Sequence, residues 1–207
     1  MIRLLSICAS PTPGSSTGIL LQTMSRAIRA GLPNEKVRET IVTVNDLNFV
    51  ACQACGEDPS PAFCFFDDDL TTVYRELERC DCLLFGSPVF FDAVSAQAKA
   101  FIDRCNCIRP PDYRATVSEY NFVKRLTRKR PGAMALVGGE QGWFEGARRC
   151  IAGFFKWVEV VNEGTVTYRS PDFRRSGQVK ADVAALAEAE KTGVHLAKLL
   201  RTQYARR

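Results

Sequence analysis

The sequence predicts an α/β protein in which one parallel β-sheet carries helices on both faces. Five short apolar or β-branched runs alternate with five stretches of helical periodicity, which is typical of repeated strand–helix units. Three of the apolar runs end in loops rich in Gly, Pro or Ser that lead directly into a helical stretch. The 207 residues suit a single domain at 1–207, with an irregular cysteine-bearing loop at 46–66 and a polar excursion at 105–130.

The N-terminal half predicts two strands and two helices. Residues 2–8 are almost continuously apolar, which is typical of a strand buried on both faces. Residues 37–44 alternate β-branched and charged side chains, so this strand should lie nearer an edge. Apolar residues at helical spacing predict helices at 16–30 and 67–80, the second of which opens on three aspartates that suit its N-terminal dipole.

The C-terminal half continues the alternation. Apolar runs at 82–85, 133–137 and 158–168 predict three more strands. Helical spacing predicts a helix that includes Val94 to Ile102, and further helices at 143–157 and 178–201.

Three loops should converge, because the carboxyl ends of parallel strands meet at one edge of a sheet. Residues 9–17 are rich in hydroxyls and precede a helix, whose free N–H groups and dipole favour a phosphate. Neither the GxxxxGK[ST] nor the GxGxxG pattern occurs, which favours a single phosphate bound without metal. The alternative is an ordinary loop that only caps its helix. Residues 87–92 offer two phenylalanines for stacking on a flat ring and residues 138–143 offer glycine backbone, so together the loops predict bound FMN.

Composition limits the possible partners and compartment. The net charge of +5 comes largely from residues 124–130 and 201–207, where we expect solvated faces or chain ends. No aromatic residues alternate with these charges, so we expect no nucleic-acid binding. The sequence has no run of 18 apolar residues and no leader pattern, which predicts a cytoplasmic protein without a membrane partner. The odd count of nine cysteines fits a reducing compartment, with Cys8, Cys80, Cys82 and Cys150 serving as small apolar residues.

Two segments resemble the flavodoxin-like NAD(P)H-dependent FMN reductase family, close to its iron–sulfur flavoprotein branch. They are FGSPVFFDAVSAQAKAFIDR at 85–104 and ASPTPGSST at 9–17, and the likeness extends over residues 1–170. The resemblance implies a doubly wound five-stranded sheet of order 2-1-3-4-5. It also implies electron transfer from NADPH or NADH through FMN to a quinone, nitro compound, flavin or protein acceptor, in a homodimer or homotetramer. The alternatives are an iron–sulfur flavoprotein, a flavodoxin-like carrier without direct NAD(P)H oxidation, or a fold that has lost its cofactor.

The resemblance also assigns the FMN-binding residues. Those expected at the phosphate are Ser10, Thr12, Ser15, Ser16 and Thr17; those along the ring are Ser87, Pro88, Val89, Phe90 and Phe91; those at its polar edge are Gly138, Gly139 and Gly142. Thr12 stands where the family usually has arginine, and Phe90 where it usually has tyrosine. We expect no catalytic side chain, because the cofactor carries the hydride chemistry and the single histidine, His195, lies in the last predicted helix.

The cysteine loop matches the iron–sulfur branch only in part. Its spacing is Cys52-x2-Cys55-x8-Cys64, and Phe49 stands where a further cysteine would complete four ligands. Cys105 or Cys107 could supply the fourth ligand if the fold brings it close. A cluster, a structural zinc and free thiols are the alternatives, and we expect free thiols and no metal.

Three charged segments have plainer interpretations than catalysis. Asp67 to Asp69 suit a helix start better than a metal site. Asp103 and Arg104 should form a helix-end ion pair or a contact between subunits. The basic residues within 109–130 could attract the 2′-phosphate of NADPH, although a solvated lid is the expectation we favour.

Overall fold

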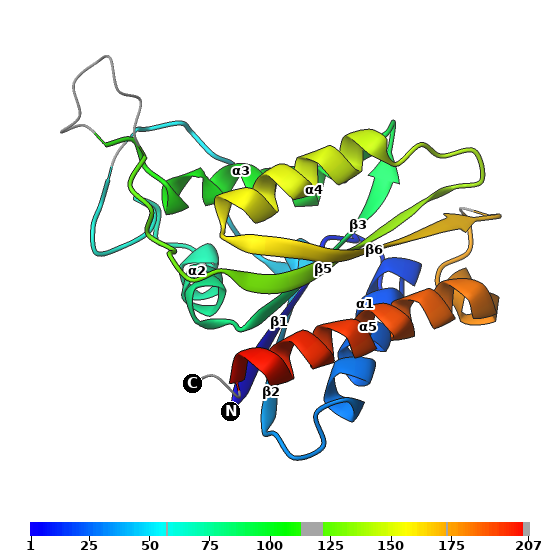
Figure 1. Ribbon diagram of the computed structural model, residues 1–207. Helices are drawn as coiled ribbons and strands as arrows, with labels where there is room; N and C mark the ends of the chain where they lie inside the picture. The colour runs from blue at the N-terminus through cyan, green and yellow to red at the C-terminus, as the bar shows by residue number, and fades with distance from the viewer. Residues whose placement is uncertain (57, 113–121, 173, 205–207) are drawn as a thin grey trace.

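The computed structural model describes residues 1–56, 58–112, 122–172 and 174–204 and is built around one twisted sheet (Figure 1). Five strands run parallel in the spatial order β2-β1-β3-β5-β6. Their bounds are Ile2–Cys8 for β1, Val37–Thr43 for β2, Cys82–Phe90 for β3, Arg130–Gly139 for β5 and Val160–Ser170 for β6. Counting only these strands gives the order 2-1-3-4-5, which confirms the predicted flavodoxin-like topology and places β2 at an edge.

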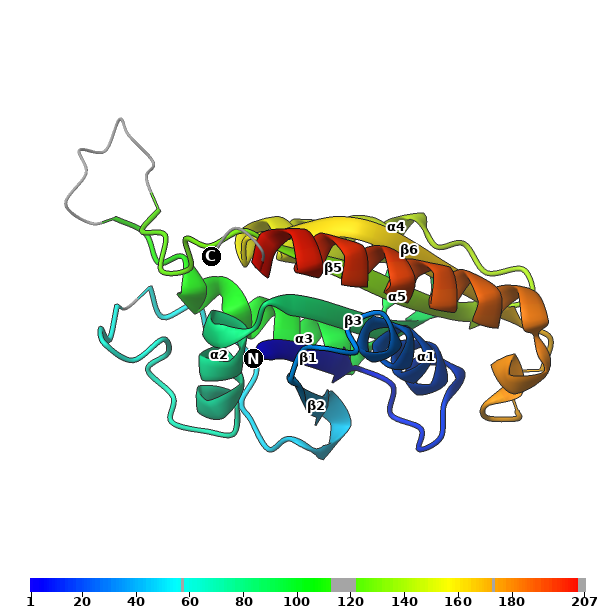
Figure 2. The same cartoon turned by 60° about the horizontal axis from the view of Figure 1, so that its bottom comes forward.

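Helices cover both faces of the sheet (Figures 1 and 2). On one face lie α1 (Ser16–Ala30) and α5 (Val183–Tyr204), and on the other lie α2 (Leu70–Arg79), α3 (Ala96–Arg104) and α4 (Glu145–Trp157). Successive side chains of β1 alternate between the two layers, so that Leu4 packs on the α1 side and Leu5 on the opposite side. No helix in the described residues is long and apolar enough to cross a membrane.

Strand register sets the positions of the three predicted loops. Cys8 at the end of β1 pairs with Gly86 in β3, and Pro88 in β3 pairs with Val137 in β5. The loops after β1, β3 and β5 therefore start from neighbouring strands at one edge of the sheet, as predicted.

The segment after β3 differs most from the sequence prediction. Instead of ending at Phe85, the strand continues to Phe90 and folds back as a hairpin onto the two-residue strand β4 (Ala93–Val94). The turn places Phe91 and Asp92 in the left-handed region, with φ of 52° and 59°. The sequence does not predict this hairpin, because its turn lacks the glycine or asparagine that usually marks such a conformation.

Smaller differences concern element ends. Strand β5 extends beyond 133–137 at both ends, and α4 begins at Glu145 rather than at Trp143. The last helix begins at Val183, because Gln178–Ala181 form a separate 3-10 turn, η3.

The basic run at 124–130 is only in part the solvated face that we expected, since Lys124 and Lys129 are exposed whereas Arg128 and Arg130 make contacts within the fold. Arg130 is 1% exposed and donates to the carbonyl oxygens of Leu77 and Val158. Arg128 donates to Asp81, 2.6 Å away. These contacts join Arg128 and Arg130 to the end of α2, and Arg130 also to the end of α4. In the excursion, Cys105–Ile108 form a short 3-10 turn, η2, and residues 113–121 lie outside the described part of the chain.

Candidate functional site

The loop after β1 presents free backbone donors at the start of α1. Ser15 caps this helix, because its Oγ accepts from the N–H of Gly18 at 3.2 Å. The N–H groups of residues 14–17 have no acceptor among the described residues. Together with the helix dipole, these open donors are the features that favour an anion at this turn.

The hydroxyls of this loop partly serve the fold. Ser10 Oγ accepts from the N–H of Thr12 at 3.3 Å, and Ser16 Oγ accepts from the N–H of Val179 at 3.3 Å. Thr17 is 1% exposed and packs on β3, where a Cβ built at Gly86 would lie 2.6 Å from its Cγ2. Backbone groups are therefore the freest donors of this turn, with Thr12 exposed beside them.

A serine pair fixes the second loop against the first. Ser95 Oγ donates to the carbonyl of Ala9 at 2.8 Å and accepts from the N–H of Ala98, which caps α3. Ser87 Oγ accepts from the N–H of Ser95 at 3.0 Å and donates to the carbonyl of Pro88 at 2.7 Å. The Ser87 hydroxyl is thus used within the loop, and Val89 is buried in the core.

The hairpin is fastened to the start of α4, the helix that follows the third loop. Asp92 Oδ1 accepts from the N–H of Gly146 at 3.1 Å, and a Cβ at Gly146 would lie 2.3 Å from the carbonyl oxygen of Asp92. Within the third loop, the N–H of Gly142 closes a tight turn onto the carbonyl of Gly139 at 2.8 Å. The three loops lie along one rim, with the second loop joined by hydrogen bonds to the first loop and to the start of α4 just after the third.

Exposed aromatic side chains line this rim. Phe90 is 52% exposed, Phe91 is fully exposed and Trp143 is 76% exposed. Sequence reasoning assigned Trp143 to a helix, and its position beside the glycine loop was the available signal for a role at the rim. Large apolar rings left in solvent at a loop cluster mark a surface that a flat ligand or a partner covers.

A cavity of about 360 Å³ lies beside the first loop, on the side of β2. Its lining includes Ser10, Ser15, Asn45 and Lys180, but no residue of the second or third loop. Lys180 lies in η3, 163 residues after Thr17 in sequence, so only the fold shows that a cation stands near a turn that lacks the family's arginine.

These features fit FMN. Open N–H donors at the α1 N-terminus suit a phosphate, and the exposed phenylalanines of the hairpin suit a stacked ring. By position, residues 10–17 would hold the phosphate, residues 88–91 the ring face, and residues 138–142 the ring edge.

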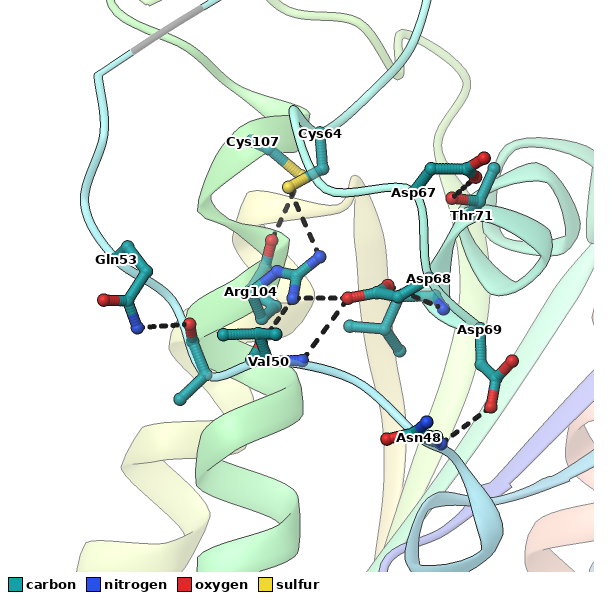
Figure 3. A network of polar contacts seen from close by, with 12 residues as sticks. Asn48, Val50, Gln53, Cys64, Asp67, Asp68, Asp69, Thr71, Arg104 and Cys107 are labelled. Carbon is teal, nitrogen blue, oxygen red and sulfur yellow. Dashed lines mark hydrogen bonds and ion pairs between the residues drawn. The ribbon is translucent and has the colours of Figure 1, made fainter.

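The cysteine loop packs around Arg104 at the end of α3 (Figure 3). The guanidinium group is 1% exposed, pairs with Asp68 at 2.8 Å, and donates to the carbonyl of Val50 and to Cys64 Sγ, the latter at 3.4 Å. Cys107 lies beside Cys64 and donates to the carbonyl of Arg104 at 3.0 Å. Burial raises the pKa of the Cys107 thiol to about 12.

The three aspartates precede α2, which begins at Leu70 rather than at Asp67, so they do not form its first turn as expected. Asp68 accepts from the N–H of Leu70, Asp69 from the N–H of Asn48, and Asp67 from the hydroxyl of Thr71 (Figure 3). Asp103 and Arg104 do not pair with each other, because Asp103 binds Lys99 on the outer face of α3 while Arg104 points inward to Asp68. His195 lies 3.4 Å from Glu163, away from the rim loops.

A flavodoxin-like sheet with an anion-binding turn and an aromatic hairpin defines the class of FMN-binding α/β proteins. Comparison with known proteins is more specific. Residues 2–167 match the family model described as NADPH-dependent FMN reductase. The chain belongs to this family, and it is a flavin-dependent oxidoreductase that uses FMN.

Individual relatives and structures agree with this placement. An iron–sulfur flavoprotein of Methanocaldococcus jannaschii is 24% identical over 205 residues, covering 97% of this chain and 98% of the relative. One of Methanosarcina thermophila is 26% identical over 162 residues, covering 77% and 74%. Among solved structures, RosB with a bound flavin intermediate has a TM-score of 0.71 at 12% identity, covering 98% and 81%. An apo NADH:FMN oxidoreductase has a TM-score of 0.62 at 12% identity, covering 95% and 89%, and both structures show the fold alone.

Proposed function

We propose that the protein takes electrons from NADPH or NADH through bound FMN and passes them to a small-molecule acceptor such as a quinone, nitro compound or flavin, or to a protein. The observation that carries this proposal is the rim, where free N–H donors stand next to exposed aromatic side chains. When bound, FMN supplies the hydride and electron chemistry. The protein has to bind, orient and shield it.

The chain's own residues divide this work by position. The N–H groups of residues 14–17 bind the phosphate, with Thr12 and Ser10 beside them and Lys180 near. Pro88, Phe90 and Phe91 would hold the ring of bound FMN through apolar contacts. Gly138, Gly139 and Gly142 place backbone close to the polar edge of the ring, where side chains would block the approach. No side chain has to act as acid or base.

We also propose that the protein acts as a homodimer or homotetramer. Phe91 is fully exposed and Trp143 is 76% exposed, and large apolar side chains in solvent mark a surface that a partner covers. A second copy placed over the rim would bury them and would complete the acceptor pocket.

Among the described residues of 109–130, two arginines make contacts within the fold. Arg109 contacts Glu159 and the carbonyl of Trp157, and Arg125 contacts Asp58, so both arginines brace the fold. We propose that either nicotinamide serves as donor.

Anaerobic stopped-flow mixing tests the proposal. The purified protein should show two flavin absorption bands that bleach on mixing with NADPH, with NADH, or with both. Dithionite serves as the control for a reducible flavin. Bleaching by dithionite but by neither nicotinamide would identify an electron carrier instead, and a purified protein that neither contains nor binds FMN would refute the proposal.

A further inference from the structure

The turn after β1 offers donors to a phosphate but carries no positive side chain of its own. Residues 9–17 contain neither lysine nor arginine. Their free N–H groups and the dipole of α1 together amount to about half a positive charge. A phosphate ester carries about −1.5 to −2 charges at neutral pH. A full countercharge can therefore come only from another segment of the chain.

The connection after β6 is packed directly onto this turn. The N–H of Val179 in η3 donates to Ser16 Oγ at 3.3 Å. Gly177, which precedes η3, has a φ of 72°, and a Cβ built there would lie 2.8 Å from the carbonyl oxygen of Gly14. Glycine permits both this backbone conformation and this close approach. The fold thus holds the start of η3 against the turn, although the two segments are distant in sequence.

The next residue of η3 is a lysine that shares a cavity with the turn. Lys180 lines the cavity of about 360 Å³ together with Ser10, Thr12 and Ser15. Among the described residues of this lining, Lys180 is the only one with a positively charged side chain. The packing of η3 therefore brings one full cation to the side of the free N–H groups.

The charge of Lys180 is not used within the protein. It has no ion-pair partner in the part of the chain that the structure describes, although Glu39 and Asp46 line the same cavity. The carboxylate of Glu39 pairs instead with Arg29. Asp46 follows β2 and lies beyond ion-pair distance of the lysine. A lysine beside open N–H donors, with no carboxylate to neutralise it, suits a bound anion.

We propose that Lys180 binds the FMN phosphate and supplies the full positive charge that the turn lacks. The connection after β6 is then a fourth part of the cofactor site, beside the three loops of the rim. Because the lysine acts on the phosphate, it makes the site select FMN over riboflavin, which has the same ring without the phosphate. The inference rests on the proposed function, since it concerns the phosphate of the FMN bound there.

Flavin titration of the full chain tests this role. Lys180→Met should raise the dissociation constant of FMN about five- to tenfold at low salt, between the effects of an exposed ion pair and of a buried charged hydrogen bond. The dissociation constant of riboflavin should not change. Lys180→Arg should keep most of the FMN affinity, because it keeps the charge. The loss in Lys180→Met should shrink at high ionic strength, which screens the charge in the wild type.

A matched control lies in the same connection. Arg175 pairs with Asp172 at 3.7 Å and does not line the cavity, so Arg175→Met should bind FMN as the wild type does. Adding Thr12→Arg to Lys180→Met should recover part of the lost affinity, because it returns a cation to the turn. Urea unfolding followed by circular dichroism checks that each variant is folded.

Three results would overturn the proposal. They are an unchanged FMN affinity in Lys180→Met, an equal loss of FMN and riboflavin affinity in that variant, and an equal loss of FMN affinity in Arg175→Met. The second would indicate a structural role, and the third a general attraction by positive surface. In all three the wild type still binds FMN, so the proposed function stands. A wild-type protein that binds neither flavin would refute the proposed function and this assignment with it.

Discussion

The rim and the cysteine loop are held in place by different parts of the chain. At the rim the freest donors are backbone N–H groups, and their positions follow from the ends of neighbouring strands and from one helix start. At the cysteine loop, hydrogen bonds from a side chain hold the structure, because the guanidinium of Arg104 contacts segments that lie far apart in sequence. The structure of the rim should therefore be disturbed most by shifts of the backbone. The structure around the cysteine loop should be disturbed most by the loss of individual side chains.

Replacing Arg104 should have the largest effect on stability. Arg104→Met removes a buried cation and leaves Asp68 and the carbonyl of Val50 without their donor, which should lower the free energy of unfolding by about 3–5 kcal/mol. Urea unfolding followed by circular dichroism measures the change.

The matched control lies one turn earlier on the same helix. Lys99 pairs with Asp103 at 2.7 Å, but both side chains are well exposed, so Lys99→Met should cost only about 0.3–0.5 kcal/mol. Equal losses from the two variants would show that burial does not distinguish these ion pairs and would remove the basis of the comparison.

Crowding the backbone at the rim should have the next largest effect on the free energy of unfolding. A methyl group at Gly146 would lie 2.3 Å from the carbonyl of Asp92, so Gly146→Ala should cost about 1–3 kcal/mol and displace the hairpin. Flavin titration should show weaker FMN binding as the hairpin moves. Gly153→Ala, on the same helix, meets nothing within 4 Å and should stabilise the protein by about 0.5–1 kcal/mol. Destabilisation by both variants would point to α4 itself rather than to the hairpin contact.

The sequence predicted the rim well, since each part of it has a local signal. Alternating strands and helices predicted the parallel sheet, the family resemblance implied its strand order, and Ser15, Ser16 and Thr17 marked the start of α1. The sequence prediction failed where the backbone adopts a conformation that its residues rarely adopt. Phe91 and Asp92 adopt positive φ because the hairpin is held by Gly146 and Ser95, and contacts of that kind leave no trace in the local sequence.

Removing the hydrogen bond between the first two loops should have a moderate effect on the free energy of unfolding. Ser95→Ala removes both the cap of α3 and the donor to the carbonyl of Ala9, which should cost about 1–2 kcal/mol in unfolding free energy. Ser176→Ala removes an exposed contact to Pro13 on the other side of the first loop and should stay within about 0.5 kcal/mol of the wild type. A loss from Ser176→Ala as large as that from Ser95→Ala would contradict the proposed junction.

The surroundings of the cysteine loop were predicted only in part. The spacing of Cys52, Cys55 and Cys64 identified a possible metal loop, but the place of Cys107 depends on the end of α3 packing against that loop. Likewise Arg104 was expected near Asp103, whereas helix α3 turns it inward to Asp68. Contacts between distant segments decide this region, and no periodicity in the sequence encodes them.

The smallest effect should come from a side chain added at the rim. Thr12 is exposed beside the free N–H groups of α1, so Thr12→Arg places a cation near the FMN phosphate without disturbing the fold. An exposed pair of this kind contributes about 0.2–1 kcal/mol, so the dissociation constant of FMN should fall by up to about fivefold at low salt. The gain should disappear at high ionic strength, which screens exposed charges. Riboflavin, which lacks the phosphate, serves as the matched ligand, and its affinity should not change. If riboflavin gains as much as FMN, the arginine acts on the ring and the phosphate does not lie at this turn.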